Sequence, residues 1–151
     1  FNSAQTVTLS VSTSGAVIHY TTDGSAPNGA SPIYSGPISV TVNTTIKAIS
    51  VKAGWTTSNT VSETYNIRVA TPAFAPGTGT YSSSVNVSMS CSTSGAEILY
   101  TTDGSSPNSG STLYTGSIPV NTLGLTTIKA IAIKAGMTDS LIMTNQYTII
   151  P

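Results

Sequence analysis

The sequence predicts an all-β protein built as two tandem β-sandwich domains. The first observation behind this prediction is an internal repeat: Ser12–Ala16 recurs as Ser92–Ala96, and Tyr20–Ser25 recurs as Tyr100–Ser105, both 80 residues later. The second is a strand-like alternation of apolar and polar residues, interrupted by turn residues at regular intervals. Identical strings in one order and at one offset indicate the duplication of a single structural unit.

The repeat continues toward the end of each copy with one change of length. Thr44–Ile49 recurs as Thr126–Ile131, and Lys52–Gly54 recurs as Lys134–Gly136, so the offset has grown to 82. A two-residue insertion therefore lies within Asn121–Leu125, which we expect to be a turn, where extra length is tolerated.

The boundary between the copies is expected near Arg68–Pro72, which gives domains of residues 1–68 and 69–151. The second copy has a lead-in, Thr71–Tyr81, whereas only Phe1–Gln5 precede the first strand pattern of the first copy. We therefore expect the first domain to lack its first strand, which would leave backbone groups unpaired at a sheet edge. No signal peptide is visible, and the simplest expectation is a piece of a longer protein.

The first strands follow from alternation with a period of two, the pattern of a strand with one buried face. The alternating apolar residues are Val7, Leu9 and Val11 in the first copy, and Val85, Val87, Met89 and Cys91 in the second. The next strand places Ile18 and Tyr20 on one face and His19 on the other. Asp23-Gly24 and its match Asp103-Gly104 follow, a residue pair typical of a hairpin turn that needs a positive φ.

The later strands complete each sandwich. Thr45–Ala53 is apolar on both faces, so its buried face is not decided by period alone. The last strand carries Val61, Tyr65 and Ile67, matched by Met143, Tyr147 and Ile149. Six or seven short strands in about 75 residues indicate a β-sandwich, and a domain of this size is expected to be only marginally stable alone.

The composition argues against several partners. Only 7% of the residues are charged, with five Lys plus Arg, five Asp plus Glu and a net charge of zero. The chain therefore has no basic surface for nucleic acid or for an anionic membrane, and no run of about 18 apolar residues that could span a bilayer. Cys91, the single cysteine, is expected to be a buried, inert thiol.

The recurring motifs, taken in order, resemble a known family. They are Y-T-T-D-G-S-x-P, then Leu or Ile followed by Tyr-x-Gly, then T-T-I-K-A-I, K-A-G, and a closing Ser and Tyr. This set is similar to the chitobiase/β-hexosaminidase C-terminal-type repeat over nearly all of both copies. The resemblance implies an immunoglobulin- or fibronectin-III-like fold. It also implies a non-catalytic accessory module of a secreted, extracellular bacterial protein that acts on carbohydrate, with no family-wide ligand residues.

No group of side chains predicts catalysis, a metal site or a cofactor. Asp23 and Asp103 are repeated, but a turn explains them fully. His19, matched by Leu99, and Cys91 lie outside the repeated pattern, and we expect His19 to be a solvated strand residue. A glycosidase needs two acids that flank one cleft, and calcium needs more carboxylates than one per loop. The chain is therefore expected not to be an enzyme.

Exposed aromatic residues beside polar groups are the features that would bind a carbohydrate. Trp55 follows a Lys-Ala-Gly turn, from which the indole would project, and Asn59 is close in sequence. Tyr34 and Tyr114 occupy a repeated loop or short strand. These four are the predicted ligand-binding residues. Trp55 has two other possible roles, a plug at the end of the sandwich or a contact with the neighbouring domain. Its match is Met137, so any binding should be weak and unequal between the copies.

Three functions remain open: a carbohydrate-binding accessory module, a structural spacer, and a docking surface for other domains of a longer parent chain. Pro72 and Pro76 stiffen the linker, which favours spacing or docking. Trp55 favours binding, because a large indole on a loop calls for a contact. We take the first function as the prediction, with a polysaccharide as the partner and neither nucleic acid nor a membrane.

Overall fold

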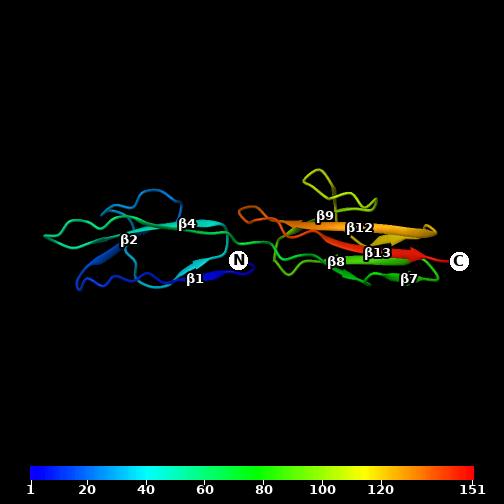
Figure 1. The fold of residues 1–151 in the computed structure, drawn as a ribbon, viewed down its shortest axis with the longest axis horizontal. Helices are drawn as coiled ribbons and strands as arrows, with labels where there is room; N and C mark the ends of the chain where they lie inside the picture. The colour runs from blue at the N-terminus through cyan, green and yellow to red at the C-terminus, as the bar shows by residue number, and fades with distance from the viewer. The chain divides into compact units, whose positions relative to one another are not determined.

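The computed structural model describes every residue from Phe1 to Pro151, and these residues form two compact units. Unit 1 is Phe1–Ile67 and unit 2 is Arg68–Pro151 (Figure 1). Every regular element in both units is a β-strand, which confirms the predicted all-β fold class. No helix of the length and apolar character needed to cross a membrane is present.

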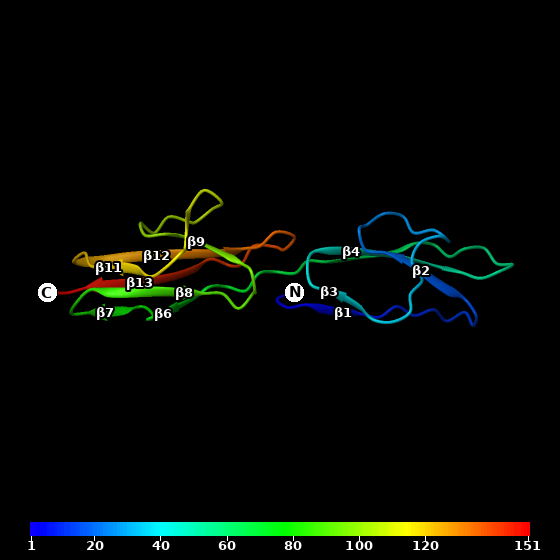
Figure 2. The same cartoon turned by 180° about the vertical axis from the view of Figure 1, so that it is seen from behind.

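Unit 2 is a sandwich of two sheets, with the orders β10-β9-β12-β13-β7 and β11-β8-β6. Its strands are β6 (Ala73–Ala75), β7 (Gly79–Tyr81), β8 (Val85–Ser90), β9 (Glu97–Thr101), β10 (Thr112–Leu113), β11 (Ile118–Val120), β12 (Gly124–Ile133) and β13 (Met143–Ile149). Neighbouring strands are antiparallel except β13 and β7, which are parallel. Figure 2 shows β8 and β6 on one side of the unit and β12 on the other, with the segment after β9 arching away from its sheet.

Unit 1 repeats this plan with fewer strands, in sheets of order β2-β4-β5 and β1-β3. They are β1 (Gln5–Val7), β2 (Val17–Thr21), β3 (Ile38–Val40), β4 (Thr44–Val51) and β5 (Val61–Tyr65). Nothing in unit 1 corresponds to β6 and β7, because β1 is the counterpart of β8. The expectation that the first domain lacks its first strand is therefore confirmed.

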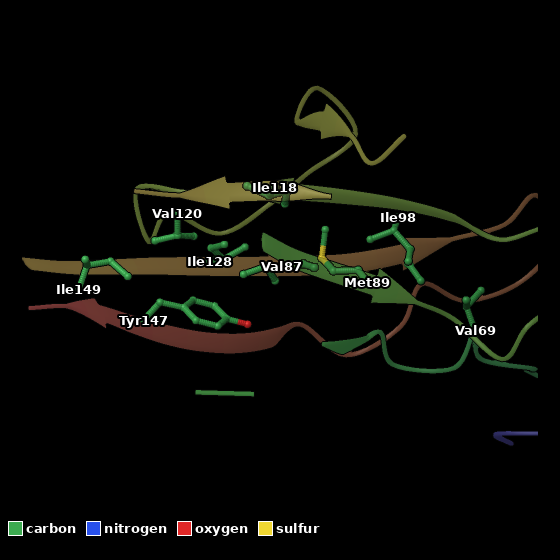
Figure 3. Packing of buried hydrophobic residues seen from close by; sticks show 11 residues of the cluster. Val69, Val87, Met89, Ile98, Ile118, Val120, Ile128, Tyr147 and Ile149 are labelled. Carbon is green, nitrogen blue, oxygen red and sulfur yellow. The ribbon is translucent and has the colours of Figure 1, made fainter. Parts of the chain in front are cut away.

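The core of unit 2 lies between its sheets, where Val87 of β8 faces Ile128 of β12 and Tyr147 of β13 (Figure 3). All three side chains are fully buried, whereas Asn86 and Ser88 beside Val87 are exposed. This alternation is the predicted period of two. Cys91 is a free thiol that packs partly buried against this core, and its Sγ lies 3.2 Å from the carbonyl oxygen of Ala70.

The core of unit 1 is smaller. Its buried apolar residues are Val7, Val40, Ile46, Ile49 and Ile67. Strand β4 is apolar on both faces because both are covered: Ile46 and Ile49 point to opposite faces, and both are buried.

The prediction of a solvated His19 is wrong. The side chain is only 8% exposed, and its Nδ1 lies 2.7 Å from the carbonyl oxygen of Ser31. The segment after β2 returns alongside this strand and forms an isolated antiparallel bridge between His19 and Ile33. Leu99, the matching residue in unit 2, is buried in the same way.

The Asp-Gly pair forms a turn, but it does not close a tight hairpin: the chain returns antiparallel beside β2 only at Ile33, which bridges to His19. Gly24 has a φ of +78°, as predicted, and its amide donates to the carbonyl oxygen of Thr45 over 3.1 Å. Oδ1 of Asp23 accepts hydrogen bonds from Oγ and the amide of Ser25, at 2.6 and 3.0 Å. These bonds, the side-chain one first, lower the pKa of the Asp23 carboxyl. Asp103 makes the same contacts with Ser105.

Candidate functional site

Trp55 lies in the loop that joins β4 to β5. Its amide donates to the carbonyl oxygen of Lys52 over 3.0 Å, which closes a tight turn. Gly54 within that turn has a φ of +79°, a left-handed conformation that glycine adopts without the cost imposed on other residues. The indole that follows is 65% exposed. Trp55 is therefore not a buried plug at the end of the sandwich.

Lys52 lies against one face of the indole, with Nζ 4.9 Å from the ring centroid. At this distance the ammonium group is attracted to the electron-rich face of the ring. The contact restricts the orientation of the indole at the loop while most of its surface stays in solvent. A positioned aromatic face is better suited to stacking on a ligand than a freely rotating one.

Polar side chains follow Trp55 in the same loop. Thr56, Thr57 and Asn59 are exposed, and the side chain of Asn59 makes no hydrogen bond. Ser58 instead turns toward the sheet, where its hydroxyl accepts a 2.9 Å hydrogen bond from the amide of Ser50. The structure therefore places two predicted site residues, Trp55 and Asn59, on one exposed loop with spare hydrogen-bonding groups.

Tyr34 and Tyr114, the other two predicted site residues, lie elsewhere. Each is partly buried and meets another tyrosine edge to face: Tyr34 meets Tyr20 at 6.3 Å between ring centroids, and Tyr114 meets Tyr100 at 6.4 Å. The hydroxyl of Tyr114 also accepts a 3.0 Å hydrogen bond from the amide of Met89. These contacts hold both rings within their own units, and the Trp55 loop contains neither of them.

The matching loop of unit 2 has the same backbone and a different side chain. The amide of Met137 donates to the carbonyl oxygen of Lys134 over 3.1 Å, and Gly136 has a φ of +78°. Met137 is partly buried and packs against the core of the unit. The loop also binds the start of the unit, because the carbonyl oxygen of Thr138 accepts from the amide of Val69 over 2.9 Å. Unit 2 thus offers no aromatic platform at this loop.

A hollow of about 790 Å³ in unit 2 was not predicted from the sequence. Its lining includes an apolar floor and a polar rim, made by Ile131, Ile133, Met137, Glu97, Lys134 and Asp139. Both carboxylates are exposed, and Nζ of Lys134 donates to the carbonyl oxygen of Ser94 over 2.7 Å. The hollow can accept a polar ligand over its apolar floor. The signal in the sequence is a difference between the copies, since Glu97 and Asp139 replace Val17 and Thr57.

No three residues among the histidine, cysteine, aspartate and glutamate side chains come together as a metal-binding group. The carboxylates at the hollow have no histidine or cysteine beside them in its lining. The aromatic loop of unit 1 and the hollow of unit 2 both combine apolar surface with polar groups.

A comparison with family profiles decides the family. The profile of the chitobiase/beta-hexosaminidase C-terminal domain matches residues 1–63 and 76–144, which is more than half of the chain. The chain belongs to this family. One matched segment of the chitobiase/beta-hexosaminidase C-terminal domain falls in each unit, so the predicted resemblance is confirmed for both copies. The chain is thus an accessory, immunoglobulin-like module of a family named after carbohydrate-active enzymes.

Comparisons with individual proteins add little to this assignment. No curated protein matches the chain. Among solved structures, the fibronectin(III)-like modules of Clostridium thermocellum CbhA match with a TM-score of 0.38 and 14% identity. The match covers 98% of this chain and 86% of that one.

Proposed function

We propose that this chain is a non-catalytic accessory module of a secreted, extracellular bacterial protein that acts on polysaccharides, and that it binds carbohydrate at the Trp55 loop. The observation that carries the proposal is the indole, 65% exposed on a tight turn. A large exposed apolar group marks an interaction site when polar groups surround it. A sugar ring offers C–H groups to stack on an indole and hydroxyls for Asn59 and Thr57.

The environments of the reactive side chains support a non-catalytic role. A glycosidase uses a general acid kept protonated by apolar burial, and the Glu97 and Asp139 carboxylates are exposed. His19 is buried, with Nδ1 against the carbonyl oxygen of Ser31. Cys91 is partly buried, and its Sγ donates to the carbonyl oxygen of Ala70. None of these groups is paired as a nucleophile with a base.

The proposed binding is weak and belongs mainly to unit 1. Trp55 is the single tryptophan, and Met137 holds its place in unit 2. Two linked sites raise the overall affinity only when both engage the same ligand. The second unit, which lacks the tryptophan, therefore adds little to the affinity of the chain for a polymer. We therefore expect retention on an insoluble polysaccharide that carries many copies of the ligand, with fast release of soluble sugar.

One observation favours a second candidate function, a structural spacer or a module that docks on other domains of its parent chain. The amide of Ile67 donates to Oδ1 of Asn43 in unit 1, and the amide of Val69 donates to the carbonyl oxygen of Thr138 in unit 2. Only Arg68 lies between these two anchored residues. A connection this short suits a spacer, which would need no ligand.

A retention assay separates these candidates. The two-unit chain, Trp55→Ala and the matched control Met137→Ala are incubated with insoluble cellulose, chitin, xylan and β-1,3-glucan, and the bound fraction is measured. We expect the wild type and Met137→Ala to be retained on at least one polymer, and Trp55→Ala to be released. Trp55 is exposed, so its removal should leave the fold intact, which circular dichroism checks. Equal behaviour of all three proteins on every polymer would favour the spacer.

A further inference from the structure

The loop that follows β2 in unit 1 contains the single Asn-Gly pair of the chain, Asn28-Gly29. The side-chain amide of an asparagine is open to attack by the backbone nitrogen of the next residue, and a glycine has no Cβ to hinder that approach. Both residues are exposed. The exposure is a property of the repeated loop, because the matching residues Asn108 and Ser109 are also exposed in unit 2, where β6 and β7 are present.

The conformation of the loop does not call for glycine at position 29. Gly29 does not have the positive φ that Gly24 has, and a Cβ at Gly29 would meet no atom within 4 Å. In unit 2 the residue is Ser109, and Asn108 before it makes the same hydrogen bonds as its counterpart. The loop therefore folds in the same way with a serine or a glycine at this position, and the two units differ in how open the asparagine is to attack.

The hydrogen bonds around Asn28 favour attack on its side chain. Its Oδ1 accepts a 2.8 Å hydrogen bond from the amide of Ala30. A donor at a carbonyl oxygen stabilises the negative charge that develops there when a nucleophile adds to the carbonyl carbon. The amide of Gly29 makes no hydrogen bond, so its nitrogen is not held by another group. An activated carbonyl and an unengaged nucleophile thus belong to consecutive residues of one exposed loop.

The Asp23-Gly24 turn, a few residues earlier, lacks this combination. The amide of Gly24 donates to the carbonyl oxygen of Thr45 over 3.1 Å, so an attack by its nitrogen would break that hydrogen bond. Oδ1 of Asp23 is held by Ser25. We therefore expect Asp23 to stay unchanged where Asn28 reacts.

We propose that Asn28 is a site of spontaneous modification, where deamidation by the Gly29 nitrogen converts the asparagine to aspartate and isoaspartate. The nitrogen of Gly29 forms a bond to Cγ of Asn28, the bond between Cγ and Nδ2 breaks, and ammonia leaves with the amide proton of Gly29. The product is a cyclic succinimide. Water then opens this ring at either of its two carbonyl groups, and the two openings give aspartate and isoaspartate.

Isoaspartate changes the contacts that hold the loop. The amide of Asn28 donates to Oγ of Ser31 over 2.9 Å, and the amide of Ser31 donates to the carbonyl oxygen of Asn28 over 3.0 Å. In isoaspartate this carbonyl becomes a free carboxylate, and the main chain gains a methylene group. Ser31 also places its own carbonyl oxygen 2.7 Å from Nδ1 of the buried His19. The modification therefore loosens the segment beside His19 and lowers the stability of unit 1.

The reaction is followed by incubating the full chain in mildly alkaline buffer and mapping its peptides by mass spectrometry, which detects the exchange of NH2 for OH. We expect Asn28 to convert at least about threefold faster than Asn108, because the Cβ of the next residue restricts the backbone in unit 2. The rate should rise with pH, since the attacking amide must lose its proton. Isomerisation of Asp23 as fast as the conversion of Asn28 would overturn the role of the unengaged amide.

Reciprocal variants exchange the two loops. Gly29→Ser should slow the conversion of Asn28 to the rate of Asn108, and Ser109→Gly should raise the rate of Asn108 to about that of Asn28. Neither change alters a buried side chain, and circular dichroism checks that both variants fold. The proposal is overturned if Asn28 and Asn108 convert at equal rates in the wild type, or if Gly29→Ser leaves the rate of Asn28 unchanged.

The effect on unit 1 is measured on the converted protein. Wild type and Gly29→Ser are incubated for the same time, and the thermal transition of each is followed by the fluorescence of Trp55, which lies in unit 1. We expect the converted wild type to unfold at a lower temperature than it did before incubation, and Gly29→Ser to keep its midpoint. An unchanged midpoint in a wild type that carries isoaspartate at position 28 would overturn the loss of stability.

Discussion

Tyr147 and Tyr65 occupy matching positions in the two units, and their hydroxyl groups differ in what they bind. The Tyr147 hydroxyl donates to the carbonyl oxygen of Pro76 and lies 3.3 Å from the buried amide of Asn145. Burial raises the pKa of the Tyr147 phenol. The Tyr65 hydroxyl makes no hydrogen bond. The same residue therefore stabilises one unit through its hydroxyl and the other through its ring alone.

Removing these hydroxyl groups tests this difference. We expect Tyr147→Phe to lower the free energy of unfolding of unit 2 by about 1–2 kcal/mol, because the partly buried Pro76 carbonyl loses its hydrogen-bond donor. Tyr65→Phe is the matched control, and its effect should stay within about 0.5 kcal/mol. Denaturant unfolding measures both, and equal losses in the two variants would contradict the assignment.

At the same scale, the sequence indicated Trp55 because glycine in a tight turn and a following indole are local features. The environments of His19 and Glu97 could not be predicted in this way. His19 is buried because a segment more than ten residues later returns beside it, with Ser31 and Ile33 as its contacts. Glu97 reaches the hollow of unit 2 beside residues more than thirty positions later, such as Asp139.

Among the elements, strands with one buried face were predictable and their partners were not. Val85–Ser90 alternates as a strand should, and β8 has these bounds. Asp23-Gly24 suggested a hairpin, because a local turn commonly joins neighbouring strands. The chain instead returns beside β2 only at Ile33, and on its other edge β2 pairs with the more distant β4, a pairing that depends on the whole sandwich. The Asp-Gly pair predicts the positive φ of Gly24, but it does not predict which strands pair on either side of the turn.

The Asp-Gly loop after β9 makes a prediction about acid. Hydrogen bonds from Ser105 hold the pKa of Asp103 below its ordinary value, so the unfolded state takes up the proton first as the pH falls. The stabilisation is present above the ordinary pKa and is lost as the pH falls through the folded pKa. Ser105→Ala should move the pKa of Asp103 upward toward its ordinary value in an NMR titration, and an unchanged pKa would contradict the role of Ser105.

For the molecule as a whole, the two units differ in the size of their cores. Most of the fully buried side chains belong to unit 2, where β6 and β7 complete the sandwich. Stability follows the apolar surface removed from water, so unit 1 should be the weaker half.

This difference predicts that unit 1 melts first. Trp55 is the single tryptophan and lies in unit 1, so its fluorescence should change at a lower temperature than the circular dichroism of the remaining sheet. Ile128→Ala removes a fully buried side chain and should cost unit 2 about 2–5 kcal/mol without moving the tryptophan transition. A single transition seen by both probes would show that the units unfold together.

The measurement that tests the central claim most directly is the fluorescence of Trp55 during titration with soluble oligosaccharides of cellulose, chitin, xylan and β-1,3-glucan. Because no other tryptophan is present, any change in the emission belongs to this loop. Binding at the indole predicts a saturable change in intensity or wavelength with at least one sugar, and no such change with the others. A constant spectrum with all four sugars, while the protein is still retained on the matching polymer, would show that carbohydrate binds elsewhere and would contradict the role of Trp55.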